Sequence, residues 1–362
     1  MKPKISQHLT FLIFSAKGWG TGSALRAYYI AQALKKRGHQ VQFVKPIPTL
    51  PLWLDMLLAA PYYLFRSLLT RAQVSLVVKP YPMVIPALAW QRLLGSKIVV
   101  DVDDLDFAYS RGHFRKFHEQ LQKPWPRWAD LVTYHNPKLR ETLLDFFKVP
   151  ATKMVQLPQG VDTELFNSNP VDLNNLPNRA KILLAGKKRP ILTFTAHLNV
   201  ACDLEPALVA FQSIHKSIPD AQLLVAGGGP EESRFKQTAQ KLRISGAVHF
   251  TGYLSNRQVA ACLKISSLIL VYYKQVTANE YRASMKLREA AACGLPVVAT
   301  GVGENINWKS FAAISQPDPI HFAETVLKTL KVKKKSKPSI QLLKRWDWTA
   351  CVEALEKVLL KS

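Results

Sequence analysis

Cysteine and acidic residues are both scarce in this sequence. Its four cysteines form no closely spaced pair and no metal-binding pattern, so reduced thiols of a cytosolic protein are the simplest interpretation. Asp and Glu number 25 against 49 Lys and Arg, which gives a formal net charge of +24. Such a charge favours a polyanionic partner: nucleic acid, an anionic membrane face or a phosphorylated acceptor. No zinc finger, RNA-recognition signature or basic zipper is present, so we do not expect nucleic acid.

Long uninterrupted apolar runs are also absent. The run at 11–14 is too short for the apolar core of a signal peptide and fits a first β-strand. The most apolar segment, 50–69, is interrupted by Asp55, Pro61 and Arg66, whereas a membrane-spanning helix needs ~20 uninterrupted apolar residues. This segment fits either a bilayer interface or a buried helix pair, and the basic charge favours the interface. We therefore expect a cytoplasmic protein, with a peripheral position on the cytoplasmic face of the membrane as an option.

Length and composition predict a globular protein of more than one domain. A chain of 362 residues exceeds one typical hydrophobic core. Its content of 48% hydrophobic and 20% charged residues is that of a folded protein and not of a disordered one.

The first 44 residues predict a strand, a glycine-rich loop, a helix and a second strand. The loop reads KGWGTGS at 17–23 and precedes a helix expected at 24–37. Gly20 and Gly22 would let the backbone approach a ligand at the helix N-terminus, although a tight turn alone would also need small residues. The spacing does not match a dinucleotide fingerprint and no acidic residue follows the second strand, so a Rossmann-type cofactor is not expected.

The segment 279–300 carries the clearest local pattern. Ser284 is placed to cap a helix and Gly294 to end it in a left-handed conformation, with a short buried strand to follow. Lys286 lies in the first turn, where free amides and the positive end of the helix dipole suit a phosphate. Glu289 lies on the same face three residues later. This arrangement favours a nucleotide sugar, with Lys286 on the diphosphate and Glu289 on the ribose.

Four carboxylates lie in the run DVDDLD at 101–106, where a predicted strand ends. This is the edge of a parallel sheet at which ligands usually bind. One interpretation is a metal site that holds a nucleotide diphosphate. In the others, Asp103 and Asp104 contact acceptor hydroxyls or order the loop, or an aspartate caps the next helix.

The run SMKLREAAACGLPVVAT at 284–300 resembles the donor-site signature of retaining glycosyltransferases with the GT-B fold, specifically family 4. Glu289 matches the second of two glutamates that many members carry. Tyr281 stands where the first is expected, and Glu280 is one residue away. What remains resembles a variant in which a serine and a lysine precede a single glutamate.

The chain departs from this family after the first strand of the second domain. Members usually carry an arginine in a G-R-L run there and a lysine about five residues later, whereas this chain has Ala196-His197-Leu198 and Cys202. Two cations that would neutralise a leaving diphosphate are therefore missing. Lys286, Arg282 and a protonated His197 would have to replace them; the other reading is that activity has been lost.

The resemblance implies an α/β protein with the GT-B fold, in which two Rossmann-like parallel-sheet domains face each other across a cleft and a C-terminal helix crosses back. The expected acceptor-side domain is 1–170 and the linker is 171–180. The nucleotide-sugar-binding domain is expected at 181–345, and a helix packing back towards the first domain at 346–362.

The resemblance also implies roles for individual residues. The candidate catalytic residues are Lys286, His197 and Glu280; the candidate donor-binding residues are Glu289, Ser284, Arg282, Tyr253, Leu254, Gly20 and Gly22; the candidate acceptor-side residues are Asp103, Asp104 and His113.

The implied function is transfer of a hexose-type sugar from a nucleoside diphosphate sugar to a hydroxyl of a glycan or lipid-linked acceptor. Retention of configuration is expected, and no metal or other cofactor is expected to be required. The expected biological setting is the synthesis of cell-envelope polysaccharide. An anionic membrane surface is a further expected partner, through 50–69 and basic patches. Two alternatives remain: a catalytically silent GT-B protein that binds an anionic polymer, a membrane or a partner enzyme, and epimerisation of the nucleotide sugar.

Overall fold

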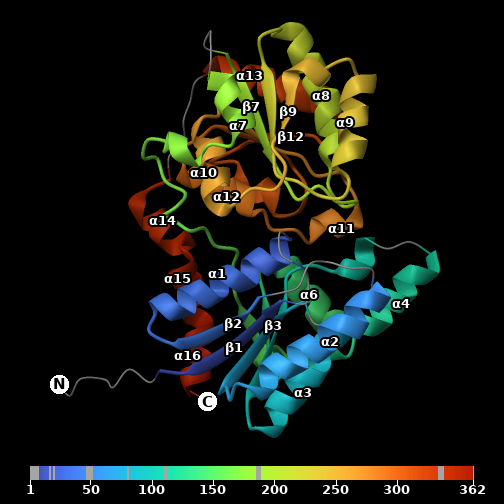
Figure 1. Ribbon diagram of the computed structural model, residues 1–362, viewed down its shortest axis with the longest axis vertical. Coiled ribbons are helices and arrows are strands. Elements are labelled where there is room, and N and C mark those ends of the chain that lie inside the picture. Colours follow the sequence, from blue (N-terminus) through green and yellow to red (C-terminus); the bar gives the residue numbers. More distant parts are fainter. Residues whose placement is uncertain are drawn as a thin grey trace, which may run out of the picture. The chain divides into compact units, whose positions relative to one another are not determined.

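The chain folds into two compact α/β units, each built around one parallel sheet of six strands (Figure 1). The computed structural model describes residues 8–15, 18, 21–45, 52–79, 81–109, 112–184, 189–332 and 338–361. Unit 1 comprises Met1–Gln159 and Trp348–Ser362, and unit 2 comprises Gly160–Asp347. The predicted α/β class with two parallel sheets is confirmed.

The sheet of unit 1 has the strand order β2-β1-β3-β4-β5-β6. Its strands are β1 (Thr10–Ser15), β2 (Gln40–Val44), β3 (Val74–Val78), β4 (Lys97–Val102), β5 (Leu131–Tyr134) and β6 (Met154–Gln156). The flanking helices are α1 (Gly22–Lys36), α2 (Leu52–Leu68), α3 (Ile85–Leu93), α4 (Gly112–Gln122), α5 (Trp125–Trp128), α6 (Pro137–Asp145), α15 (Trp348–Cys351) and α16 (Glu353–Lys361), with short 3-10 turns η1 (Pro82–Val84), η2 (Asp106–Tyr109) and η3 (Ala151–Lys153).

The sheet of unit 2 has the strand order β12-β11-β10-β7-β8-β9. Its strands are β7 (Ile191–Thr195), β8 (Gln222–Ala226), β9 (Val248–Phe250), β10 (Leu268–Val271), β11 (Val297–Thr300) and β12 (Ala313–Ser315). Its helices are α7 (Asn178–Lys181), α8 (Leu204–Ser217), α9 (Glu232–Lys241), α10 (Asn256–Lys264), α11 (Thr277–Glu280), α12 (Met285–Ala292), α13 (Pro319–Val332) and α14 (Ile340–Trp346), with 3-10 turns η4 (Leu173–Asn175), η5 (Ile182–Leu184), η6 (Ser245–Ala247) and η7 (Gly303–Trp308).

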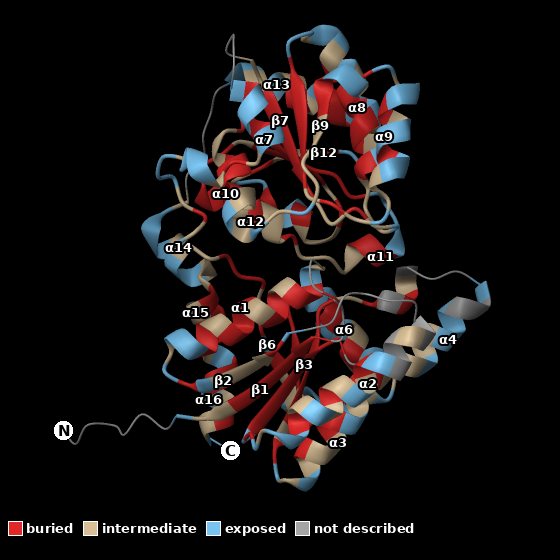
Figure 2. Ribbon diagram, viewed as in Figure 1, coloured by how far each residue is buried: buried red, intermediate tan, exposed pale blue. Residues whose placement is uncertain are grey.

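The core of each unit is formed by the sheet and the inner faces of its helices. The central strands β3, β7 and β8 are buried along their whole length, whereas the outer faces of the helices are exposed (Figure 2). This burial explains why those strands consist mostly of Val, Leu, Ile and Phe and show no alternation of apolar and polar residues: a parallel sheet covered on both faces has no polar side.

The strand order locates the place where ligands bind in open parallel sheets. Such ligands lie beyond the carboxyl ends of the strands, where the order reverses and two neighbouring loops leave in opposite directions. In unit 2 the order reverses between β7 and β10, and in unit 1 between β1 and β3. The loops that follow these four strands are therefore the places to look for a site.

The observed boundaries differ from the expected ones. Residues 171–180, expected to be a linker, contain Leu176 and Ala180, which are buried in a cluster of unit 2, and the chain passes from unit 1 to unit 2 after Gln159 instead. In place of one terminal helix at 346–362 the structure has two short ones, α15 and α16, and the preceding α14 ends at Trp346 and belongs to unit 2.

The C-terminal segment packs as an integral part of unit 1. Its Trp348 is 3% exposed and stacks on Tyr29 of α1, with ring centroids 5.7 Å apart and planes 9° from parallel. Glu356 of α16 contacts His39 Nε2 at 2.8 Å and also pairs with Arg37. These contacts join residues more than 300 positions apart in the sequence.

Candidate functional site

Helix α12 begins and ends as its sequence predicts. The Ser284 hydroxyl accepts a hydrogen bond from the Leu287 amide at 3.4 Å, which satisfies one of the free donors of the first turn. Gly294 ends the helix with φ +68°, in the left-handed region that other residues avoid. Strand β11 follows directly, so α12 starts beside the carboxyl end of β10, at the reversal point of the sheet.

Lys286 and Glu289 are partly buried on one face of α12. Among the described residues neither side chain makes a hydrogen bond or an ion pair; Lys286 Nζ lies 5.1 Å from the centroid of the Phe194 ring. Burial lowers the pKa of Lys286, and Cys202 and Glu289 act in the opposite direction. Burial raises the pKa of Glu289 to about 7, while Lys286 lowers it. Both groups are therefore desolvated without a partner of their own, which is typical of residues that bind a ligand.

The neighbouring cations are held by carboxylates. Arg282 donates to the Ala201 carbonyl at 3.0 Å and lies 3.9 Å from the Asp203 carboxylate, which also accepts from Asn279 Nδ2 at 2.8 Å. Arg288 pairs with Glu304 at 2.5 Å. The loop after β7, the turn before α12 and the loop after β11 are thereby connected around Lys286.

A glycine turn closes the other side of this edge. Gly227 has φ +136°, and a Cβ there would come within 2.0 Å of the Ala196 carbonyl oxygen. The Leu198 amide donates to the Gly228 carbonyl at 3.0 Å, and the Gly227 amide donates to the Thr251 hydroxyl at 3.1 Å. The loops after β7, β8 and β9 therefore pack backbone against backbone, which only glycine permits.

His197 lies in the loop after β7, with its ring 6.0 Å from that of Tyr253. Its Nδ1 is buried and has no hydrogen-bond partner among the described residues. Burial lowers the pKa of His197, opposed by a backbone hydrogen bond with Gly228. The structure therefore favours a neutral imidazole at pH 7 and argues against the expectation that a protonated His197 replaces a missing cation.

The two residues expected near a base differ in exposure. Tyr253 is 66% exposed, whereas Leu254 is partly buried against the cluster that contains Leu176 and Ala180. Tyr253 thus offers a ring face to a ligand, and Leu254 serves packing.

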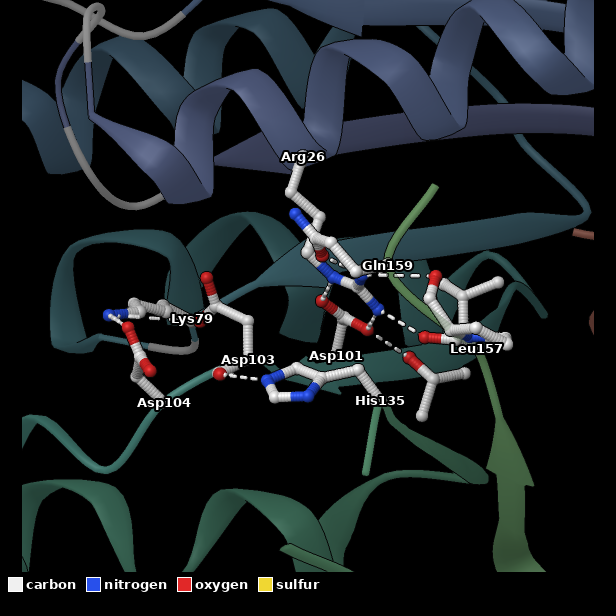
Figure 3. A network of polar contacts seen from close by, with 10 residues as sticks. Arg26, Lys79, Asp101, Asp103, Asp104, His135, Leu157 and Gln159 are labelled. Atoms are coloured by element: carbon white, nitrogen blue, oxygen red, sulfur yellow. Dashed lines mark hydrogen bonds and ion pairs between the residues drawn. The ribbon is translucent and has the colours of Figure 1, made fainter. Parts of the chain in front are cut away.

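Unit 1 carries a buried polar network at the carboxyl end of β4 (Figure 3). The Arg26 side chain of α1 is 1% exposed and donates from Nε and Nη2 to the two oxygens of Asp101, at 2.7 and 2.9 Å. It also donates from Nη1 to Gln159 Oε1 at 2.7 Å and from Nη2 to the Leu157 carbonyl at 2.8 Å. In this bidentate pair the two buried charges neutralise each other, so the role of Asp101 is structural.

Asp103 and Asp104 lie beside Lys79, which follows β3 (Figure 3). Lys79 Nζ is 3.7 Å from Asp103 and 3.4 Å from Asp104. Burial raises the pKa of Asp103 to about 7, with Lys79 acting against it. Lys79 and Asp104 also line a small pocket with Val102, Leu105, Gln122, Pro126 and Phe147. Among the described residues no three His, Cys, Asp or Glu side chains are grouped to hold a metal ion.

The positions of the remaining predicted site residues give little information about their roles. Gly22 begins α1, and a Cβ there would meet no atom within 4 Å. Glu280 ends the short helix α11, five residues before α12. Gly20 and the side chain of His113, in α4, lie outside the described residues.

Three groups at these edges escaped the sequence analysis: Arg26, Lys79 and Asp203. Arg26 had one visible signal, because it is a single charge among apolar residues of α1 that are otherwise buried. Nothing in the sequence marked Lys79 or Asp203. Lys79 follows a predicted strand and Asp203 directly precedes a helix, as many surface residues do.

Models of known protein families match segments of both units. A model of glycosyl transferases group 1 matches residues 177–341, and a model of glycosyltransferase family 4 matches residues 20–165. The chain belongs to the family 4-like glycosyltransferases with the GT-B fold.

Curated relatives match about half of the chain. An alpha-monoglucosyldiacylglycerol synthase of Streptococcus pneumoniae is 28% identical over 176 residues, which are 48% of this chain and 38% of the relative. A GDP-mannose-dependent alpha-(1-6)-phosphatidylinositol monomannoside mannosyltransferase of Mycobacterium tuberculosis is 25% identical over 177 residues, 48% of this chain and 45% of the relative. The matches thus span less than half the length of either relative.

Solved structures share the fold over nearly the whole chain. Sucrose-phosphate synthase from Thermosynechococcus elongatus superposes with a TM-score of 0.74 at 16% identity, covering 98% of both chains. Anabaena HepE in complex with UDP and glucose gives a TM-score of 0.71 at 16% identity, covering 98% of this chain and all of the other. At these identities the likeness shows the fold alone.

Proposed function

We propose that this chain transfers a hexose-type sugar from a nucleoside diphosphate sugar to a hydroxyl of a lipid-linked or glycan acceptor, with retention. The observation that carries the proposal is the pair Lys286 and Glu289, which are desolvated at the reversal point of the unit 2 sheet and make no hydrogen bond or ion pair with the described residues. Its family membership and the names of its relatives support the same reading.

Lys286 would bind the diphosphate of the donor. The negative charge of the leaving nucleoside diphosphate grows in the transition state, so a cation already fixed beside it stabilises that state more than the ground state. Arg282, which Asp203 holds in place, would add a smaller contribution, because that carboxylate offsets part of its charge. Tyr253 would offer its ring to the base, and Glu289 would accept hydrogen bonds from the ribose hydroxyls in its ionised form.

The acceptor is proposed to be lipid-linked because the relatives are named for diacylglycerol and phosphatidylinositol acceptors. In unit 1, Asp103 and Asp104 would orient its hydroxyl, with Lys79 holding the two carboxylates in place. We expect the reaction to need no metal and to run at the cytoplasmic face of the membrane.

One observation favours a second candidate, a catalytically silent GT-B protein that binds a partner or an anionic polymer. Cys202 and His197 occupy the positions of the family's two cations, and burial raises the pKa of Cys202 and lowers that of His197, so both are neutral. A donor site with so little positive charge would hold a nucleotide more weakly than turnover requires.

Thermal stabilisation by nucleotide sugars distinguishes the two candidates. UDP-, GDP- and ADP-sugars are tested with magnesium and with EDTA on the parent protein, on Lys286→Met and Glu289→Gln, and on the control Lys236→Met, at an exposed position of α9. A ligand at 100 times its Kd should add about 2.7 kcal/mol of stability. The transferase predicts stabilisation by one nucleotide in EDTA, lost in the first two variants only, and release of that nucleotide when acceptor is added. Stabilisation that depends on magnesium would contradict the metal-independent mechanism, and binding without turnover would favour the silent protein.

A further inference from the structure

The outward face of helix α2 is apolar. The residues that α2 turns towards the rest of unit 1 are Ala59, Tyr63 and Ser67, four positions apart, and all three are buried. The opposite side, together with the residue that directly follows the helix, carries four large apolar side chains that are at least half exposed. These are Leu58 (50%), Phe65 (58%), Leu68 (50%) and Leu69 (66%), and we call them the α2 stripe.

Such a face is unusual for a helix on a protein surface. A surface helix normally buries its apolar side and turns charged residues to water. The α2 stripe instead leaves roughly 400 Å² of apolar surface in water, which is in the range of the largest apolar patch on a typical monomer, and such a patch is often functional. From Leu58 to Leu69 it extends over 12 residues, or about 16 Å along the helix axis. No helix among the described residues is long and apolar enough to cross a membrane.

The part of the sequence that contains the α2 stripe is strongly basic. Residues 1–100 contain 13 Lys and Arg and a single acidic residue, Asp55. Arg66 lies within the stripe's own helix and the exposed Arg71 follows it. The Tyr62 hydroxyl donates to the Lys45 carbonyl at 3.0 Å, which brings the exposed Lys45 alongside α2. An apolar face bordered by basic residues matches the boundary between acyl chains and anionic headgroups.

We propose that the α2 stripe docks this chain onto an anionic lipid bilayer, with the helix in the plane of the interface. The apolar side chains enter the boundary of the acyl chains, and Lys45, Arg66 and Arg71 lie at the level of the headgroups. This docking deepens the proposed function and depends on it in one respect: a lipid-linked acceptor is reached from the membrane surface.

Vesicle sedimentation tests the proposal on the full chain. Vesicles of phosphatidylcholine alone are compared with vesicles containing phosphatidylglycerol, for the parent protein and for the double variant Phe65→Ser/Leu69→Ser. The matched control is Ile320→Ser/Ile340→Ser, which removes two equally exposed apolar residues of unit 2, at 65% and 71% exposure. Each variant is also tested for stabilisation by the nucleotide sugar, a readout that lies in unit 2.

The expected results follow from the chemistry of the stripe. The parent and the control bind phosphatidylglycerol vesicles, and Phe65→Ser/Leu69→Ser binds them at least tenfold more weakly, because two large apolar side chains no longer enter the interface. Arg71→Gln weakens binding about fivefold, the loss expected for one basic residue at an anionic surface. Stabilisation by nucleotide sugar is the same in all of these proteins.

Three results would overturn the docking surface: no binding of the parent protein to anionic vesicles, equal binding by Phe65→Ser/Leu69→Ser, or conversion of a dimer to a monomer by that variant without vesicles. The last would show that a second copy covers the stripe. Failure of the proposed function looks different: vesicle binding remains, while no nucleotide sugar stabilises the parent protein.

Discussion

Replacing Glu289 by glutamine is expected to stabilise the unliganded protein at pH 8 while weakening nucleotide-sugar binding. Burial raises the pKa of Glu289 from 4.5 to about 7. Between these values the native state holds a proton that the unfolded chain has released, so the free energy of unfolding falls as the pH rises through this window and is constant above it. Glutamine does not ionise, so the free energy of unfolding of the variant does not fall in this way.

The size of the gain follows from the same shift. A change from 4.5 to about 7, at about 1.36 kcal/mol per pKa unit, gives on the order of 3 kcal/mol as an upper limit. Glu289 is only partly buried, and solvent screening reduces the value, so we expect about 1–3 kcal/mol above pH 7 and almost none at pH 4.5.

Urea unfolding of the parent and of Glu289→Gln at pH 5 and pH 8 measures the difference directly. Because each comparison is made at one pH, the other titrating groups, Asp103 among them, cancel. Glu232→Gln, at the start of α9, is the control and should show no such gain. A difference between parent and variant that does not change between pH 5 and pH 8 would refute the reasoning, since it would mean that the Glu289 carboxylate is well solvated.

The same carboxylate should make nucleotide-sugar affinity depend on pH. If its ionised form accepts from the ribose hydroxyls, affinity rises about tenfold between pH 6 and pH 8, as the ionised fraction does for a pKa near 7. Titration calorimetry should use the nucleotide sugar, because the terminal phosphate of a free nucleoside diphosphate ionises in the same range. Glu289→Gln should bind weakly at every pH, and a pH-dependent affinity in that variant would assign the effect to another group.

Three further predictions concern other parts of the chain. Arg26→Met should cost about 3–5 kcal/mol in urea unfolding, because it leaves Asp101 charged and buried; a loss below about 1 kcal/mol would show that water reaches that carboxylate. Gly227→Ala should sharply reduce the yield of folded protein, whereas Gly246→Ala, where a Cβ meets nothing within 4 Å, should leave the melting temperature nearly unchanged; equal behaviour of the two would contradict the close packing of the loops. Cys202→Lys should tighten nucleotide-sugar binding about tenfold at low salt and less at high salt, and unchanged affinity in calorimetry would place Cys202 away from the diphosphate.

The sequence predicted the local structure around Lys286 and Glu289 because the determinants there are local. Ser284 caps α12 through an amide three residues away, and Gly294 ends the helix from its own backbone conformation. The positions of Lys286 and Glu289 on one face follow from helical periodicity alone. Where a residue's role depends on neighbours within one turn, its sequence context contains that information.

The parts that were missed depend on contacts between distant residues. Arg26 binds Asp101 and Gln159, which are 75 and 133 positions away. The sequence analysis gave Asp101 no role of its own for this reason, because nothing between 101 and 106 reveals which aspartate faces an arginine of α1. The expected positive charge of His197 failed similarly, since the burial that lowers its pKa is produced by the loops after three different strands.

Comparing the charged groups of the chain with one another supports the assignment of the donor site. Arg26, Arg282 and Arg288 are desolvated, and each lies against a carboxylate that compensates for the loss of water. Lys286 and Glu289 lose hydration at the same kind of sheet edge, and the described residues offer neither of them a hydrogen bond or ion pair. Desolvating charges without such compensation destabilises a fold, and a ligand with a diphosphate and a diol supplies the two kinds of group that these side chains lack. The destabilisation predicted for Glu289 and the binding predicted for it are therefore two measurements of one property.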